Sequence, residues 1–119
     1  MLLFKKKFLE AIRAGRKTQT IRVWKHRMMR SGQRSYIPGA GYIHVASVDE
    51  VDLARLTDAD ALPDGFDSAH ALRSELTTLY AAQLAAGQRV YRVCFTVLPP
   101  QEQEAAAANR RAAKASATA

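Results

Sequence analysis

The sequence predicts one α+β domain followed by a short tail, and three observations lead to this prediction. Apolar residues near the N-terminus repeat with the spacing of a helical face, several later segments alternate as strands do, and residues 68–87 carry the clearest helical pattern. A chain of 119 residues lies within the usual size of a single domain. We therefore expect the domain in residues 1–100 and an Ala-rich, mobile or marginally helical tail in residues 101–119.

The first helix is predicted from Phe4, Phe8 and Ile12, which are four residues apart and so share one face. Residues 2–4 can form a short strand leading into it. Gly15 stands where the end of a helix requires positive φ, so we expect the helix to stop there.

The segment after Gly15 and three later segments have the composition of strands. β-branched residues dominate residues 18–23, and alternation places Thr20 and Arg22 on one face with Ile21 and Val23 on the other. Further strands are expected at residues 33–37, 42–53 and 90–98, with a turn at residues 38–41 and a bulge near residues 49–50.

Two helical segments are expected between the last two strands. Thr57 can cap a short helical turn, since an acid follows it three residues later, and Pro63 limits its length. The longer helix begins after Asp67 or Ser68 as its N-cap, and Gly87 can end it. Its apolar stripe is the face expected to pack on the sheet, and it comprises Leu72, Leu76, Leu79, Tyr80 and Leu84.

Residues 15–22 carry a motif of eight residues, Gly-Arg-Lys-Thr-Gln-Thr-Ile-Arg. Gly15, Lys17 and Arg22 match the G-x-K-x-x-E-x-R pattern of ASCH domains, with Thr20 where many members have Glu. The chain therefore resembles an ASCH domain, and the Lys-Thr-x-Thr-Ile-Arg version is similar to the subfamily containing the bacterial N4-acetylcytidine amidohydrolase. Later segments follow in the order such domains use, so the resemblance covers residues 2–98.

The resemblance implies both a fold and a ligand class. The fold would be a small PUA-like mixed β-barrel of five or six strands, with one helix after the first strand and a longer helix before the last. Its work would be binding RNA or a modified nucleoside through a basic cleft. The alternative is an amidohydrolase acting on N4-acylated cytidine.

The same resemblance assigns candidate catalytic residues to Lys17, Thr20 and Asp64. The family uses Glu at the third position, so this carboxylate is one methylene shorter. If Asp64 lies beside Lys17, we expect Asp64 to accept the proton and charged Lys17 to hold the oxyanion. Two other interpretations stay open: a site that only binds, and an ordinary ion pair at the mouth of the barrel.

The positive charge of the chain is concentrated in its first third. Residues 1–36 hold 11 Lys and Arg against one acid, which gives +10, whereas residues 37–119 hold 7 against 10, which gives −3. Such a field attracts polyanions, of which nucleic acid is the commonest. The alternative is a solvated basic surface that serves solubility.

A basic loop is expected over residues 24–34, where cations and flat rings are mixed as in proteins that bind single-stranded RNA. In a different interpretation, Trp24, Met28 and Met29 cap an open end of the barrel, or form a surface for a protein partner. The candidate nucleic-acid-binding residues are Arg16, Lys17, Arg22, Trp24, Lys25, Arg27, Arg30, Arg34 and Tyr36.

The remaining composition argues against several other classes. Cys94 is the only cysteine, so neither an intramolecular disulfide nor a cysteine metal cage can form. The three histidines are dispersed without ligand spacing. We expect no metal, no cofactor and no membrane partner, since no run of about 18 apolar residues occurs. A cytoplasmic location is the expectation that fits best.

Overall fold

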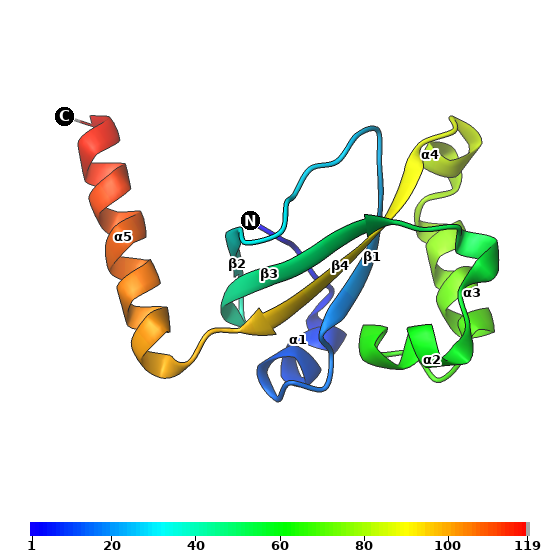
Figure 1. Cartoon of the computed structure of the whole chain (residues 1–119), viewed down its shortest axis with the longest axis horizontal. Coiled ribbons are helices and arrows are strands. Elements are labelled where there is room, and N and C mark those ends of the chain that lie inside the picture. The colour runs from blue at the N-terminus through cyan, green and yellow to red at the C-terminus, as the bar shows by residue number, and fades with distance from the viewer. Residues whose placement is uncertain (119) are drawn as a thin grey trace.

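The fold was established from a computed structural model, which describes residues 1–118, with side chains described up to residue 115. It is an α+β fold in which one curled antiparallel sheet forms a half-barrel (Figure 1). Helices gather at one end of the sheet, α1 covers one face, and the C-terminal helix α5 extends from the other end. The predicted fold class is therefore confirmed at this level.

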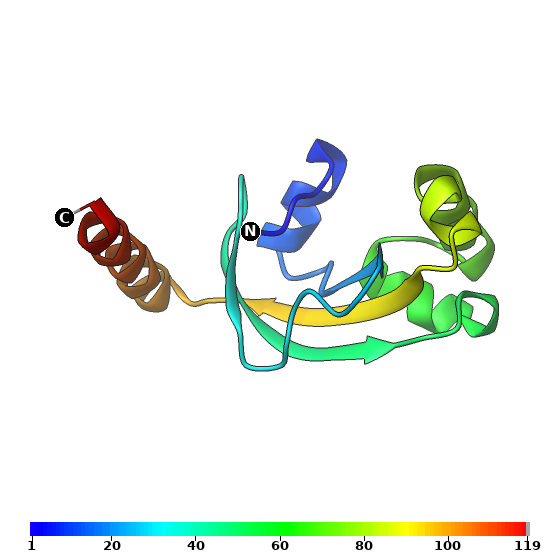
Figure 2. The same cartoon turned by 90° about the horizontal axis from the view of Figure 1, so that it is seen from above.

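The sheet holds the four strands found in residues 1–118, in the order β1-β4-β3-β2. The view in Figure 2 shows its curl. The register of β3 and β4 shifts between Val45 and Ser47, where Ser31 Oγ donates to the Ala46 carbonyl. The bulge predicted near residues 49–50 was thus misplaced. The strands are β1 Gln19–Trp24, β2 Arg34–Ile37, β3 Gly41–Glu50 and β4 Arg89–Val97.

The helix starts follow the predicted caps. Thr57 Oγ1 and the Asp60 carboxylate form a reciprocal capping box, and Ser68 Oγ accepts from the Ala71 N–H at 3.1 Å. The long helix predicted over residues 68–87 is interrupted at Tyr80, so it forms two helices. The helices are α1 Lys6–Arg13, α2 Asp58–Ala61, α3 Ala69–Leu79, α4 Ala81–Ala85 and α5 Pro100–Thr118, with 3₁₀ helices η1 Leu53–Arg55 and η2 Leu62–Asp64. Within residues 1–118, no helix is both long and apolar enough to cross a membrane.

Two hydrophobic clusters hold the sheet to its covering elements. The larger contains Val93 and Phe95 of β4 and is closed by Ile12 of α1. The smaller packs Ile21 and Val23 of β1 against Leu72 and Leu76 of α3. The alternation predicted for β1 is confirmed, because Ile21 and Val23 are buried here while Thr20 and Arg22 line a cavity described below.

Two details of the predicted barrel are corrected. Residues 2–4 form no strand, although the Leu2 N–H donates to the Tyr36 carbonyl at 2.9 Å beside β2. The Leu3 carbonyl accepts from the Arg22 guanidinium at 2.6 Å. The sheet of the described residues accordingly has four strands instead of five or six, and its pairs are antiparallel instead of mixed.

A single glutamine fastens the start of α5 to the sheet. The Gln103 side-chain amide accepts from the Tyr42 N–H at 2.7 Å and donates to the Tyr42 carbonyl at 2.8 Å. It also donates to the Leu98 carbonyl at 3.1 Å. Gly41 precedes this contact with φ +101, and a side chain there would meet Gln103 Oε1 at 2.8 Å. The first turns of α5 are thus tied to the β2–β3 turn, while the rest extends away from the sheet (Figure 1).

Replacing Gln103 by Ala is expected to lower the free energy of unfolding by about 1–3 kcal/mol, since it leaves the Tyr42 N–H without its partner, whereas the Tyr42 carbonyl keeps the Leu98 N–H at 3.0 Å. Amide hydrogen exchange of residues 100–110 should accelerate in the same variant. Gln101 is exposed on the same helix, so Gln101→Ala is the matched control and should change neither quantity measurably. Equal exchange rates in the two variants would contradict a fastening role for Gln103.

Candidate functional site

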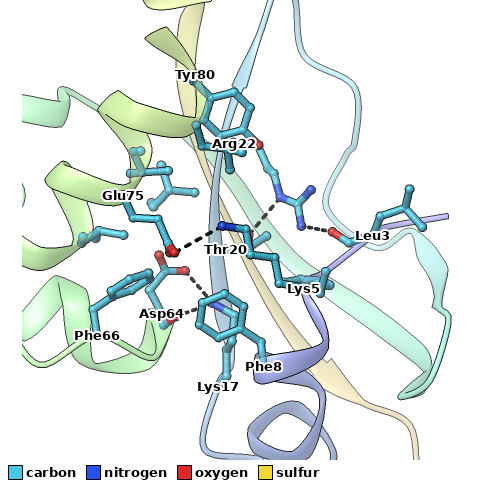
Figure 3. A pocket seen from close by; sticks show the side chains of 15 residues that line it. Leu3, Lys5, Phe8, Lys17, Thr20, Arg22, Asp64, Phe66, Glu75 and Tyr80 are labelled. Carbon is cyan, nitrogen blue, oxygen red and sulfur yellow. Dashed lines mark hydrogen bonds and ion pairs between the residues drawn. The ribbon is translucent and has the colours of Figure 1, made fainter.

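A cavity of about 100 Å³ lies where β1, the N-terminal segment, η2 and α3 meet (Figure 3). The three residues predicted as catalytic, Lys17, Thr20 and Asp64, all line it. We call it the Lys17 cavity. Its walls also include Arg22, Glu75, Tyr80 and the rings of Phe4, Phe8 and Phe66.

Two tight turns position the charged residues of the Lys17 cavity. Lys17 follows the end of α1 and lies two residues before the start of β1, whereas Asp64 is the last residue of η2. Gly65 has φ +92, a left-handed conformation that turns the chain directly after Asp64. The Thr18 N–H donates to the Pro63 carbonyl at 2.9 Å. This bond joins the start of β1 to the turn that carries Asp64, so two segments far apart in the sequence meet here.

Lys17 and Asp64 form a buried ion pair. Lys17 Nζ lies 3.0 Å from Asp64 Oδ1, and each side chain is only 3 % exposed. The ammonium also donates to the Gln19 carbonyl at 2.9 Å and to the backbone carbonyl of Asp64. These contacts use its three N–H groups. Lys17 therefore has no donor left for a developing oxyanion, and its role in this geometry is to hold Asp64.

Burial shifts the pKa values of the two groups towards each other. Desolvation lowers the pKa of Lys17 below its usual value, and the negative charge of Asp64 opposes that shift. Desolvation likewise raises the pKa of Asp64, and Lys17 opposes it. The hydrogen bond from Lys17 Nζ goes to Oδ1, so Oδ2 is the second acceptor of this carboxylate. A carboxylate with a raised pKa and a second acceptor oxygen is suited to accept a proton or an N–H.

Thr20 and Arg22 form the second polar wall of the cavity. Arg22 Nε donates to Thr20 Oγ1 at 3.0 Å, and Arg22 Nη2 donates to the Leu3 carbonyl at 2.6 Å. Burial lowers the pKa of Arg22, but a guanidinium stays charged at physiological pH. It has five N–H groups, so Arg22 keeps donors for a ligand or for the nearby Tyr80 hydroxyl. Because Thr20 Oγ1 accepts from a cation, its own O–H is left to donate.

Aromatic rings give the cavity an apolar side. The rings of Phe8 and Phe66 are 5.7 Å apart between centroids, and Lys17 Nζ lies 4.6 Å from the Phe8 centroid. The Arg22 guanidinium lies 4.7 Å from the centroid of Phe4. Both cations thus face ring surfaces, which stabilises them where water is excluded. Flat apolar walls beside directed polar groups are typical of sites for planar ligands.

Glu75 of α3 stands at the entrance, where it pairs with two lysines of the N-terminal region. Its Oε1 lies 2.8 Å from Lys7 Nζ and 3.4 Å from Lys5 Nζ, and Figure 3 shows Lys5 reaching across the opening. Lys5, Phe66 and Glu75 also line an open recess of about 710 Å³ outside. The Lys5 to Glu75 contact therefore separates a small inner space from a larger outer one.

The inner space is too small for a nucleoside in this state. Ligand pockets usually measure about 300–1,000 Å³, and 100 Å³ holds only about three waters. Both lysines are exposed, with 51 % and 57 % of their side-chain surface accessible. Movement of Lys5 away from Glu75 would join the two spaces and admit a planar base.

The candidate nucleic-acid-binding residues do not form a single patch. Lys17 and Arg22 line the Lys17 cavity, while Arg34 and Tyr36 line a second cavity near α5. Arg22, Trp24 and Lys25 line a groove between them. Three of the predicted cations line neither the two cavities nor the groove: Arg16 pairs with Glu10, Arg27 donates to the Val48 carbonyl, and Arg30 is exposed.

The three residues of the surface predicted for a protein partner differ in exposure. The Trp24 ring is half-buried against Tyr91, with centroids 5.4 Å apart, and Met29 is 8 % exposed within the larger core cluster. Met28 is well exposed, at 59 %. Core packing therefore accounts for Met29, whereas a protein partner at Trp24 and Met28 stays a prediction.

Sequence reasoning missed Glu75 and the part played by Tyr80 as cavity residues. The sequence contained a pattern that could have identified Glu75, since it is the only acid between Asp67 and Glu102 and lies beside the apolar stripe of the helix. Tyr80 was assigned to that stripe, and its place beside Arg22 depends on the interruption between α3 and α4. In the described part of the chain, no cluster of three or more His, Cys, Asp or Glu could hold a metal.

Three chains of solved structures resemble this one, among them the following two. The structure described as hypothetical protein PH0355 superimposes with a TM-score of 0.68 at 14% identity, covering 81% of this chain and 95% of that chain. Protein EF3133 from Enterococcus faecalis V583, described with the family model DUF984, gives a TM-score of 0.65 at 15% identity, covering 77% of this chain and 67% of that chain. The likeness shows the fold alone. No family model and no curated protein matches the sequence, so the ASCH resemblance stays a prediction.

Proposed function

We propose that the chain binds a pyrimidine nucleoside, free or within RNA, in the Lys17 cavity. The observation that carries the proposal is a buried ion pair, Lys17 with Asp64, at the edge of a cavity walled by aromatic rings. Buried pairs contribute little net stability because desolvation offsets their attraction. Perturbed titratable groups in a cavity are therefore a reason to infer a site.

The geometry supplies complementary partners for a cytosine ring. Asp64 Oδ2 can accept from an exocyclic amino group, and Arg22 can donate to the ring carbonyl. Phe8 and Phe66 offer flat faces on which the ring can lie. The choice of cytidine, and of its N4-acetyl form, comes from the ASCH resemblance of residues 15–22.

Amide hydrolysis is the second candidate, favoured by the Arg22 to Thr20 hydrogen bond and the raised pKa of Asp64. In this proposal, Asp64 takes a proton from water or from the Thr20 hydroxyl as its oxygen attacks the acetyl carbon. Arg22, not Lys17, donates to the oxyanion, because the donors of Lys17 are already used. The C–N bond then breaks, and Asp64 returns the proton to the cytosine nitrogen. If water attacked, acetate forms in this step; if Thr20 attacked, its acetyl ester forms, and a water molecule, deprotonated by Asp64, then hydrolyses that ester to acetate and free Thr20.

Replacing Thr20 by Val should lower the affinity for cytidine or N4-acetylcytidine about 10- to 100-fold, since the variant loses a hydroxyl held by a cation. Titration calorimetry measures the affinity, and acetate release measures turnover. Thr18 lies two residues earlier and does not line the cavity, so Thr18→Val is the matched control. Failure of the unchanged protein to bind either nucleoside, or equal affinities in the two variants, would refute the proposal.

A further inference from the structure

A second cavity, of about 340 Å³, lies between α5 and the paired strands β2 and β3. It is at the opposite end of the sheet from α3 and α4 (Figure 1). Its volume is within the usual range for ligand pockets. We call it the tyrosine cavity, and its lining includes Arg34, Tyr36, Tyr42, Asn109 and Arg110.

Two neighbouring tyrosine rings and two guanidinium groups line the tyrosine cavity. Tyr36 and Tyr42 are direct cross-strand partners, and their ring centroids are 4.9 Å apart. The Arg110 guanidinium lies 4.8 Å from the Tyr36 centroid. Arg34 contributes a second guanidinium, which lies 3.5 Å from Glu102 and is 46 % exposed. Both cations are therefore available to an anion at the edge of a ring surface.

The tyrosine cavity thus combines two of the groups that bind nucleotides. Guanidinium groups bind phosphate through their N–H donors, and aromatic rings stack with bases. Ser35 is also among the lining residues, but it lies opposite Ile43 on the core face of β2, so its buried Oγ is not counted as a ligand group. Guanidinium groups beside tyrosine rings match the phosphate and the base of a nucleotide.

A groove connects this cavity to the first one. Met1 lines both the tyrosine cavity and the groove, while Leu3 and Arg22 line both the groove and the Lys17 cavity. Trp24 and Lys25 lie along the groove. A nucleotide chain with one base near the Lys17 cavity would therefore continue past Lys25 towards Arg110.

We propose that the tyrosine cavity binds a nucleotide of single-stranded RNA, with its phosphate on Arg34 and Arg110 and its base on Tyr36. This inference deepens the proposed function, because it makes an RNA strand the ligand in preference to a free nucleoside. Arg110 moves off the Tyr36 ring as the base stacks there, and its charge then pairs with the phosphate.

The test measures binding of a fluorescent oligocytidylate of about eight nucleotides over a range of salt concentrations. Arg110→Gln should weaken binding about tenfold and make the dependence of log K on log salt less steep by about one. Arg111 is the neighbouring exposed cation, which does not line the cavity, so Arg111→Gln is the matched control and should retain most of the affinity. Far-ultraviolet circular dichroism should show equal helix content in the two variants.

Equal losses in Arg110→Gln and Arg111→Gln, or no binding by the unchanged protein, would overturn the inference. Nucleoside binding provides an independent readout, because Arg110 is not in the Lys17 cavity and its replacement should leave the affinity for cytidine unchanged. Oligocytidylate binding that depends on Arg110 without any cytidine binding would support this site while refuting the proposed function. Cytidine binding by the unchanged protein, with no effect of Arg110→Gln on oligonucleotide binding, would support the proposed function and refute a nucleotide site in the tyrosine cavity.

Discussion

Replacing Lys17 by Met is expected to lower the free energy of unfolding at pH 7 by about 3–5 kcal/mol. The substitution leaves the Asp64 carboxylate 3 % exposed without its countercharge, and it removes the ammonium that holds the Gln19 and Asp64 carbonyls. Urea denaturation measures the change. Lys6 is exposed on α1, so Lys6→Met is the control and should stay within about 0.5 kcal/mol of the unchanged protein.

Acidification should reduce the loss in Lys17→Met. Because burial raises the pKa of Asp64, the folded variant takes up a proton at a higher pH than the unfolded chain, whose carboxyl titrates near 3.8. Stability of the variant relative to the unchanged protein therefore rises as the pH falls from neutrality towards 3.8. The double variant Lys17→Met with Asp64→Asn should recover part of the stability at pH 7. If Lys17→Met lowered the free energy of unfolding no more than Lys6→Met does, the unpaired Asp64 carboxylate would not be destabilising, and the prediction would be wrong.

Asp64→Asn should lower the affinity for cytidine about 10- to 100-fold, because an amide replaces the charged acceptor proposed for the amino group. Any release of acetate from N4-acetylcytidine should fall by about 100-fold or more, which is the usual contribution of a general base. The loss should lie in kcat more than in KM if Asp64 moves a proton. Calorimetry and an acetate assay measure the two effects.

Asp67 supplies the control for that experiment, since its carboxylate is exposed three residues later. Asp67→Asn should leave affinity and turnover unchanged. If Asp64→Asn released acetate with the same dependence on pH as the unchanged protein, the proton-transfer role of Asp64 would be contradicted. An unchanged affinity for cytidine would contradict the binding role as well.

Local rules predicted much of the fold. Thr57 and Ser68 cap helices because their side chains serve N–H groups within three residues, which a sequence pattern contains in full. Gly15 has φ +77, as a helix end requires. The meeting of Lys17 with Asp64, 47 positions away, came instead from the family resemblance and not from any local pattern.

The features that sequence reasoning missed depend on distant partners. Residues 2–4 were expected in a strand, but they form none, and the Leu3 carbonyl accepts a hydrogen bond from the Arg22 guanidinium. Gln103 lies in a segment with no wide apolar face, so no sequence pattern marked it. Its side-chain amide hydrogen-bonds the backbone of Tyr42, which is 61 positions earlier. Met29 is in the core because the loop before β2 folds back over the sheet. Contacts of this kind join residues far apart in the sequence, and they form only once the sheet is assembled.

The two sides of the Lys17 cavity differ in how firmly they are held. On the Asp64 side, Gln19 Nε2 donates to the Asp60 carbonyl at 2.9 Å and Arg92 donates to the Asp60 carboxylate at 3.1 Å, so α2 and the turn after it are braced against the sheet. On the opposite side, the exposed side chain of Lys5 crosses the entrance, and exposed side chains change rotamer within picoseconds to nanoseconds. Movement of Lys5 would thus be too fast to limit the rate at which a ligand enters.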